Sequence, residues 1–208
     1  MKLKKILIPL YLSSLLVACS SHQATSFYQL KPIESINPAQ KQSLAKPITI
    51  LVMPIKFPEY LDRPQILIRD NDFKLKLSEN HRWAEPLKNE FKRVLLENLN
   101  NRIFPSTALV YSELNGLEPD ISVSIEVLQL DVNTDNQATL SVKWAYWIAK
   151  NTQKTIRLRN KYTVTVKNKD YQSRVEAQSQ AITLFTDELL NTLYSSQNST
   201  DKKTESRF

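Results

Sequence analysis

The sequence predicts one α+β domain: a mostly antiparallel sheet with two helices packed on one face, preceded by a cleaved signal. A length of 208 residues is typical of a single domain. Apolar residues alternate with polar residues in several segments, as in strands, and recur at helical spacing in two others. The segments follow the order strands, helix, strands, helix, which favours helices gathered on one face of a sheet.

Strands dominate the first part of the domain. Aromatic residues in 27–30 predict a short strand, and two prolines in 31–46 indicate a linker or surface loop. Residues 48–55 are almost entirely apolar, which is typical of an inner strand covered on both faces. Segments 65–69 and 73–77 predict two short strands around a turn.

The later elements alternate in type. Apolar spacing over 83–102 predicts a helix, with Pro86 in its first turn. Three strong strands follow, and the apolar parity of the first flips at Leu128, which indicates a bulge. A last helix over 171–194 precedes a polar tail, 196–208, that we expect to be disordered.

The third of these strong strands carries a row of basic side chains. Residues 156–166 place Arg157, Arg159 and Lys161 on the face opposite the apolar one. We interpret this row as part of a solvated sheet face, because antiparallel sheets often leave one face in water. Contact with an acidic partner or with phospholipid headgroups is the alternative.

The N-terminus is typical of a secretory signal. Three lysines precede an apolar run from Ile6 to Val17, and Ala18-Cys19 follows. A membrane-spanning helix needs about twenty apolar residues, so this run is too short. The Leu16–Cys19 ending resembles a bacterial lipobox, where the signal is cut before a cysteine whose thiol receives a diacylglyceryl group. A buried free cysteine, the alternative, fits poorly where a signal ends and a polar stretch begins.

These features define the expected organisation. We expect a signal peptide over 1–18, then a lipidated Cys19 with tether, short strand and linker up to 46. The α+β domain then occupies 47–195. Two or more acyl chains, palmitate among them, anchor a protein stably. In lipoproteins of diderm bacteria an aspartate after the cysteine favours inner-membrane retention, so Ser20 favours the outer membrane.

The amino-acid composition argues against several kinds of catalytic and binding site. The chain has one glycine, one cysteine and two histidines, which argues against phosphate-cradling loops, thiolate clusters and a zinc site. We therefore assign no catalytic residue, cofactor or metal, and expect His81 at the surface or at a helix cap. Removal of three signal lysines leaves 25 basic and 21 acidic residues, a net charge of about +4. This mild charge makes nucleic acid an improbable partner.

Two short segments, which we call blocks, are rich in side chains that commonly make specific polar or aromatic contacts. Residues 57–66 combine aromatic, acidic and basic groups in a loop between strands, and residues 81–87 do so at the predicted helix start. Tyr, Trp and Arg are common binding anchors. The simpler alternatives are local charge balance for Asp62–Arg63 and a core lid for Trp83.

Together the two blocks resemble the paraquat-inducible protein C family, the PqiC/YmbA-like transport auxiliary lipoproteins. The resemblance covers about residues 16–195 and includes the lipobox and the strand at Phe27–Leu30. Leu67-Ile68 stand where we expect a threonine beside the arginine. The residues that carry the resemblance, and that we predict to bind a partner, are Tyr60, Leu61, Asp62, Arg63, Pro64, Arg69, Arg82 and Trp83.

The resemblance implies a function beyond what the residues themselves show. It implies an outer-membrane lipoprotein that faces the periplasm, forms homo-oligomeric rings and assists a tunnel-forming MCE-domain protein of the inner membrane. Such a system moves lipids between the membranes and supports envelope integrity. The alternatives are a structural lipoprotein of outer-membrane assembly and a tethered periplasmic hydrolase using His81. Neighbouring genes would separate transport from assembly, and a His81→Ala variant would test hydrolysis.

Overall fold

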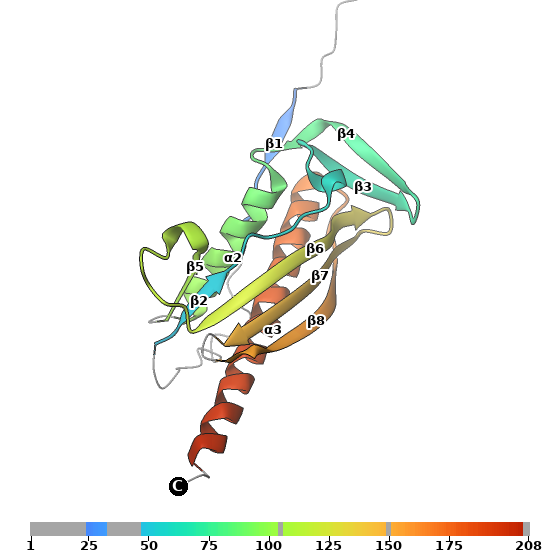
Figure 1. Cartoon of the computed structure of the whole chain (residues 1–208). Helices are drawn as coiled ribbons and strands as arrows, with labels where there is room; N and C mark the ends of the chain where they lie inside the picture. Colours follow the sequence, from blue (N-terminus) through green and yellow to red (C-terminus); the bar gives the residue numbers. More distant parts are fainter. Residues whose placement is uncertain (1–23, 33–46, 104–105, 149–150, 206–208) are drawn as a thin grey trace, which may run out of the picture.

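The computed structural model describes residues 24–32, 47–103, 106–148 and 151–205. Figure 1 shows two helices on one side of a twisted sheet, with the chain entering at β1 and leaving from the end of the last helix. The predicted signal peptide over 1–18 and the predicted lipidation site Cys19 lie outside the described residues, as does most of the predicted linker.

Eight strands form one mixed sheet. Six of them follow the order β1-β4-β3-β6-β2-β5, while β7 and β8 extend the sheet from the other edge of β6. The strands are β1 (Ser26–Tyr28), β2 (Thr49–Val52), β3 (Gln65–Asn71), β4 (Lys74–Trp83), β5 (Thr107–Val110), β6 (Ile121–Asn133), β7 (Gln137–Ile148) and β8 (Asn151–Thr165).

The predicted α+β class is confirmed, with the sheet mixed rather than mostly antiparallel. The long pairs β6–β7 and β7–β8 and the hairpin β3–β4 are antiparallel. The pairs β1–β4, β2–β5, β2–β6 and β3–β6 are parallel. Alternation of side chains cannot reveal strand direction. Parallel pairing arises because α2 and the longer loops return the chain to the same end of the sheet.

Strand β6 organises this sheet. Its first residues pair with β2, its last residues pair with β3, and β7 lines its other edge along nearly its whole length. The register with β7 shifts between Val127 and Gln129, so the bulge predicted at Leu128 is confirmed. The bulge lets apolar residues on both sides of it face the core. The inner strand predicted over 48–55 is the shorter β2, flanked by β6 and β5.

Helices α2 (Leu87–Ile103) and α3 (Tyr171–Glu205) cover the core face of the sheet. Phe91 of α2 and Phe185 of α3 are fully buried there. The helices also contact each other through polar groups, because Arg102 forms an ion pair with Asp187, with Nε 2.8 Å from Oδ1. Asp170 caps α3, since its carboxylate accepts hydrogen bonds from the Ser173 N–H at 2.7 Å and from the Ser173 hydroxyl at 3.1 Å. The hydrogen bond from the Ser173 N–H is the main cause that lowers the pKa of Asp170.

Two predicted helix boundaries differ from the structure. Residues 81–83 finish β4 instead of starting a helix, because they pair with β1. Pro86 precedes α2, and its carbonyl accepts the N–H groups of Asn89 and Glu90. At the C-terminal end, α3 continues to Glu205, where we expected a disordered tail from residue 196.

Candidate functional site

The block predicted around Tyr60 forms a short 3-10 turn, Glu59–Leu61, between β2 and β3. Leu61 is buried in the core, whereas Asp62, Arg63 and Pro64 are exposed. The Tyr60 hydroxyl donates to the carbonyl of Leu128 at 3.3 Å, at the bulge of β6. Tyr60 therefore supplies a partner for a carbonyl that the bulge takes out of the strand ladder.

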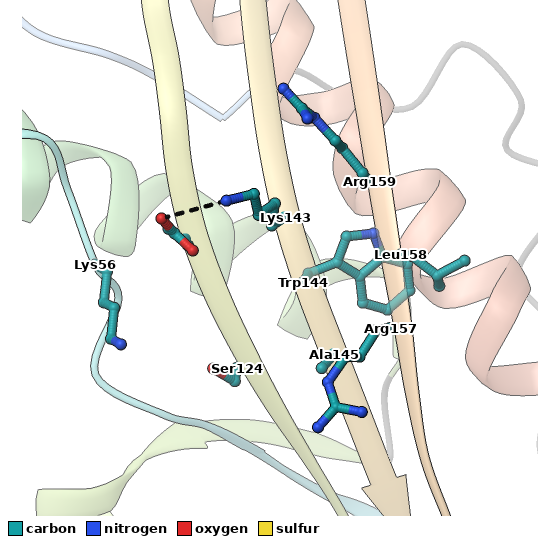
Figure 2. A pocket seen from close by; sticks show the side chains of 9 residues that line it. Lys56, Ser124, Lys143, Trp144, Ala145, Arg157, Leu158 and Arg159 are labelled. Atoms are coloured by element: carbon teal, nitrogen blue, oxygen red, sulfur yellow. Dashed lines mark ion pairs between the residues drawn. The ribbon is translucent and has the colours of Figure 1, made fainter.

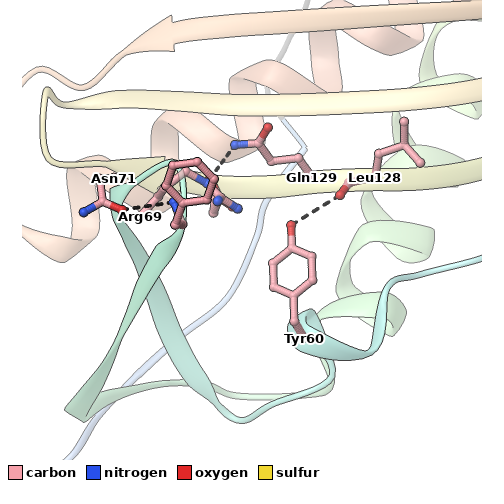
Figure 3. A network of polar contacts seen from close by, with 7 residues as sticks. Tyr60, Arg69, Asn71, Leu128 and Gln129 are labelled. Carbon is pink, nitrogen blue, oxygen red and sulfur yellow. Dashed lines mark hydrogen bonds and ion pairs between the residues drawn. The ribbon is translucent and has the colours of Figure 1, made fainter.

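Arg69 lies beside Tyr60 and is held by a buried carboxylate. Its Nη2 donates to Asp131 Oδ2 at 2.7 Å, and its Nε lies 3.2 Å from both carboxylate oxygens. The Asp131 side chain is 1% exposed and also accepts from Gln129 at 2.8 Å. Figure 3 shows this network between the hairpin and β6. Arg69 thus fastens β3 to β6, beside their short parallel pairing.

Burial and charge shift two pKa values in this network. Burial, followed by the nearby Asp131 carboxylate, raises the pKa of Tyr60 to about 12. The hydrogen bond to Asp131 is the main cause that raises the pKa of Arg69. Both shifts favour a neutral phenol beside a paired guanidinium. The network is therefore suited to stabilising the fold.

The second predicted block meets the first through the backbone. The Trp83 N–H donates to the carbonyl of Pro64 at 2.7 Å, and Arg82 pairs with Gln65 across the β3–β4 hairpin. Trp83 is 5% exposed, in line with the core-lid alternative. The structure therefore brings the two blocks together, and of the eight predicted partner-binding residues Asp62, Arg63 and Pro64 are the exposed ones.

His81 takes part in an aromatic stack that the sequence did not predict. Its ring lies 3.7 Å from the ring of Tyr171 with 14° between the planes, and its Nδ1 is 2.8 Å from the Tyr28 hydroxyl. Arg174 lies over the other ring of this stack, 5.0 Å from the centroid of Tyr171. The stack joins β1, β4 and α3. Aromatic residues on separated segments were its only signal in the sequence.

A second polar network lies between β8 and α3. The Tyr162 hydroxyl donates to Glu188 Oε2 at 2.7 Å, and Asn160 links the same carboxylate to the indole N–H of Trp144. Burial, with the Glu188 hydrogen bond second, raises the pKa of Tyr162 well above its ordinary value. Tyr162, Asn160 and Glu188 are half-buried and paired with one another between β8 and α3.

The open face of the sheet carries a groove of about 460 Å³. Basic side chains from three parts of the chain surround it, as Figure 2 shows: Lys56, Lys143, Arg157 and Arg159. Glu126 is the one acidic residue in its lining, and its carboxylate lies 3.8 Å from Lys143 Nζ. The predicted solvated face of β8 is confirmed, since Arg157, Arg159 and Lys161 are exposed. Lys56 and Lys143 were missed because only the sheet register brings them there.

Two further features are absent from the described residues. They contain no group of three or more His, Cys, Asp or Glu side chains placed to hold a metal ion. None of the described helices combines the length and the apolar character needed to cross a membrane.

Comparison with known proteins identifies the family of this domain. A family model described as "ABC-type transport auxiliary lipoprotein component" matches residues 28–189. The chain belongs to this family. The match begins at the last residue of β1 and ends within α3, so it includes β2 to β8 and all of α2. The resemblance to the PqiC/YmbA-like lipoproteins is thereby confirmed. No curated protein matches the sequence.

Two solved structures share the fold of this auxiliary lipoprotein. A crystal structure of an uncharacterized protein is 17% identical, with a TM-score of 0.67 over 82% of this chain and 99% of that chain. Protein XCC0632 from Xanthomonas campestris is 18% identical, with a TM-score of 0.67 over 85% of this chain and 99% of that chain. At these identities the likeness shows the fold alone.

Proposed function

We propose that this auxiliary lipoprotein is anchored to the outer membrane through Cys19 and works on the periplasmic side as a non-enzymatic accessory of an MCE-type lipid transport system. The family match over 28–189 carries the proposal, because it assigns the domain to ABC-type transport accessories. The lipobox ending at Cys19 and the Ser20 that follows it support the anchor and the membrane.

The placement of the conspicuous residues supports an accessory role. Tyr60, Arg69 and Trp83 are held inside the fold by hydrogen bonds or burial. His81 is engaged by two tyrosines, one at its Nδ1 and one stacked on its ring, which is a structural environment for this side chain. The exposed Asp62, Arg63 and Pro64 then make the contact with the MCE-domain protein or with a neighbouring copy in a ring.

Crosslinking in intact cells tests this function. The wild-type chain should co-purify with the MCE-domain protein and fractionate with the outer membrane, whereas Cys19→Ser should leave the membrane fraction. Arg63→Ala should reduce co-purification several-fold with an unchanged melting temperature, since Arg63 is exposed. Lys167→Ala, another exposed cation remote in sequence, is the matched control. Normal co-purification of Arg63→Ala would contradict the docking site, and loss of the MCE partner from the wild type would contradict the function.

A further inference from the structure

The open side of β6, β7 and β8 carries a concentration of exposed positive charge. We call it the basic face and define it by its exposed cations: Lys56, Lys143, Arg157, Arg159 and Lys161. Its groove holds a single acid, Glu126, whose contact with Lys143 is long, at 3.8 Å, between side chains about half exposed. Exposed pairs of this kind contribute little to stability.

The strand register places like charges next to each other. Lys143 of β7 lies directly opposite Arg159 of β8, and Arg157 and Lys161 flank Arg159 on the same face. Like charges in opposed positions destabilise a sheet. Protection of an edge strand explains cations on β8, because charged side chains discourage pairing with other chains. It does not explain Lys143 on an inner strand, nor Lys56 on the far side of β6.

The spacing of these cations fits one kind of anionic ligand. Alternate residues of β8 stand about 7 Å apart, and adjacent strands lie about 4.8 Å apart. An extended peptide presents alternate side chains at that same 7 Å repeat. The groove opens widely to solvent and is lined on one side by Arg157 and Arg159 at alternate positions of β8, so an extended chain can lie along this row. Arginine also binds carboxylates through paired hydrogen bonds.

We propose that the basic face binds an extended acidic segment of a partner protein, with carboxylates at alternate positions that pair with Arg157, Arg159 and Lys161. Lys143 adds a second cation opposite Arg159. The proposal rests on the accessory function proposed above and adds a second docking surface, separate from Asp62–Pro64, together with the chemistry of its partner. Lys56 closes the opposite side of the groove and contributes long-range attraction.

Fluorescence anisotropy on the full-length protein in nonionic detergent tests the proposal. The probe is a fluorescein-labelled peptide of alternating Glu and Thr, about eight residues long so that it spans the row on β8. We expect saturable binding that weakens as salt is added. A peptide of the same composition with its glutamates in one block should bind several-fold more weakly, because only alternation directs the carboxylates to one face.

Matched charge reversals identify the surface. Arg157→Glu/Arg159→Glu should weaken peptide binding by about ten-fold or more, since two attractions become repulsions. Lys88→Glu/Lys92→Glu changes net charge equally at exposed positions of α2 and should leave binding within about two-fold. Circular dichroism checks the fold, and Arg157→Gln/Arg159→Gln replaces the first variant if that variant does not fold.

Three outcomes would overturn the proposal. One is an equal loss of binding in both charge-reversal variants, which would indicate bulk electrostatics. Another is the absence of peptide binding. The third is binding of short-chain phosphatidylglycerol that depends on the same two arginines while the peptide does not bind, which would make the face a lipid-headgroup surface. Co-purification of the MCE-domain protein is measured separately, so peptide binding without that partner would contradict only the proposed function.

Discussion

Arg69→Met removes the guanidinium from a carboxylate that is only 1% exposed. The remaining Asp131 charge would keep its hydrogen bond from Gln129 and lose its counter-ion. Breaking a buried ion pair from one side costs about 3–5 kcal/mol, because the surviving charge is left uncompensated. The Arg69 side chain is 22% exposed, so water can enter after its removal. We therefore expect a loss near the low end, about 3 kcal/mol.

A double-mutant cycle separates the pair from its surroundings. Asp131→Asn leaves an arginine that can turn towards solvent, so we expect a loss of about 1–2 kcal/mol. Arg69→Met/Asp131→Asn removes both charges and should lose only about 1–2 kcal/mol, less than Arg69→Met alone. The expected coupling is then about 2–4 kcal/mol in favour of the pair, well above the error of additivity for independent sites.

Urea unfolding followed by tryptophan fluorescence measures these changes. For a domain of this size, about 3 kcal/mol corresponds to a fall of roughly 6–12 °C in melting temperature. Arg63→Met, at an exposed position of the same block, should change stability by less than about 0.5 kcal/mol. A loss below about 1 kcal/mol for Arg69→Met, or additive losses in the double variant, would refute a stabilising role for the pair.

Two further predictions concern the same region. The pKa of Tyr60 is about 12 in the folded protein, above its ordinary value of 10.0, so its contribution to stability is complete below pH 10 and disappears as pH rises through 12. Wild type should therefore lose about 1–2 kcal/mol more than Tyr60→Phe over that range, after allowance for solvent at this half-buried ring, and equal losses in alkaline urea titrations would contradict this. Trp83→Ala should cost about 3–5 kcal/mol in thermal or urea unfolding, because Trp83 is 5% exposed; a stable Trp83→Ala protein would show that the corner is not a core lid.

Local patterns in the sequence predicted much of the secondary structure. The alternation in 121–127 and its parity change at Leu128 correspond to β6 and its bulge, and the stripe containing Phe185 corresponds to α3. Strand direction was not accessible, because alternation is the same in parallel and antiparallel strands. The helix start at residue 83 was wrong because pairing of Trp83 with Tyr28, a contact between distant segments, extends β4.

Candidate site residues were harder to predict because residue type does not report burial. Tyr60 and Arg69 have the side chains of binding anchors, yet their partners Leu128 and Asp131 lie more than sixty positions away and make them internal. Nothing near Arg69 in the sequence indicates that carboxylate. Conversely, Arg157 and Arg159 were correctly placed on an exposed face by alternation alone. Their association with Lys56 and Lys143 required the register of three neighbouring strands.

Arg69 and the cations of the basic face have different roles. Arg69 is paired with Asp131. The segment around Tyr60–Arg69, which carries the family resemblance, holds the β3–β4 hairpin, the bulge of β6 and the end of β4 together. The residue pattern of this segment is therefore explained by its contribution to stability. The cations of the basic face have one weakly placed acid among them and oppose each other across β7 and β8. Edge protection accounts for the cations of β8, but the opposed charges of Lys143 and Arg159 destabilise the sheet. An anionic partner would relieve the repulsion on binding, so a partner-induced rise in thermal stability that disappears in Arg157→Glu/Arg159→Glu follows directly from mass action.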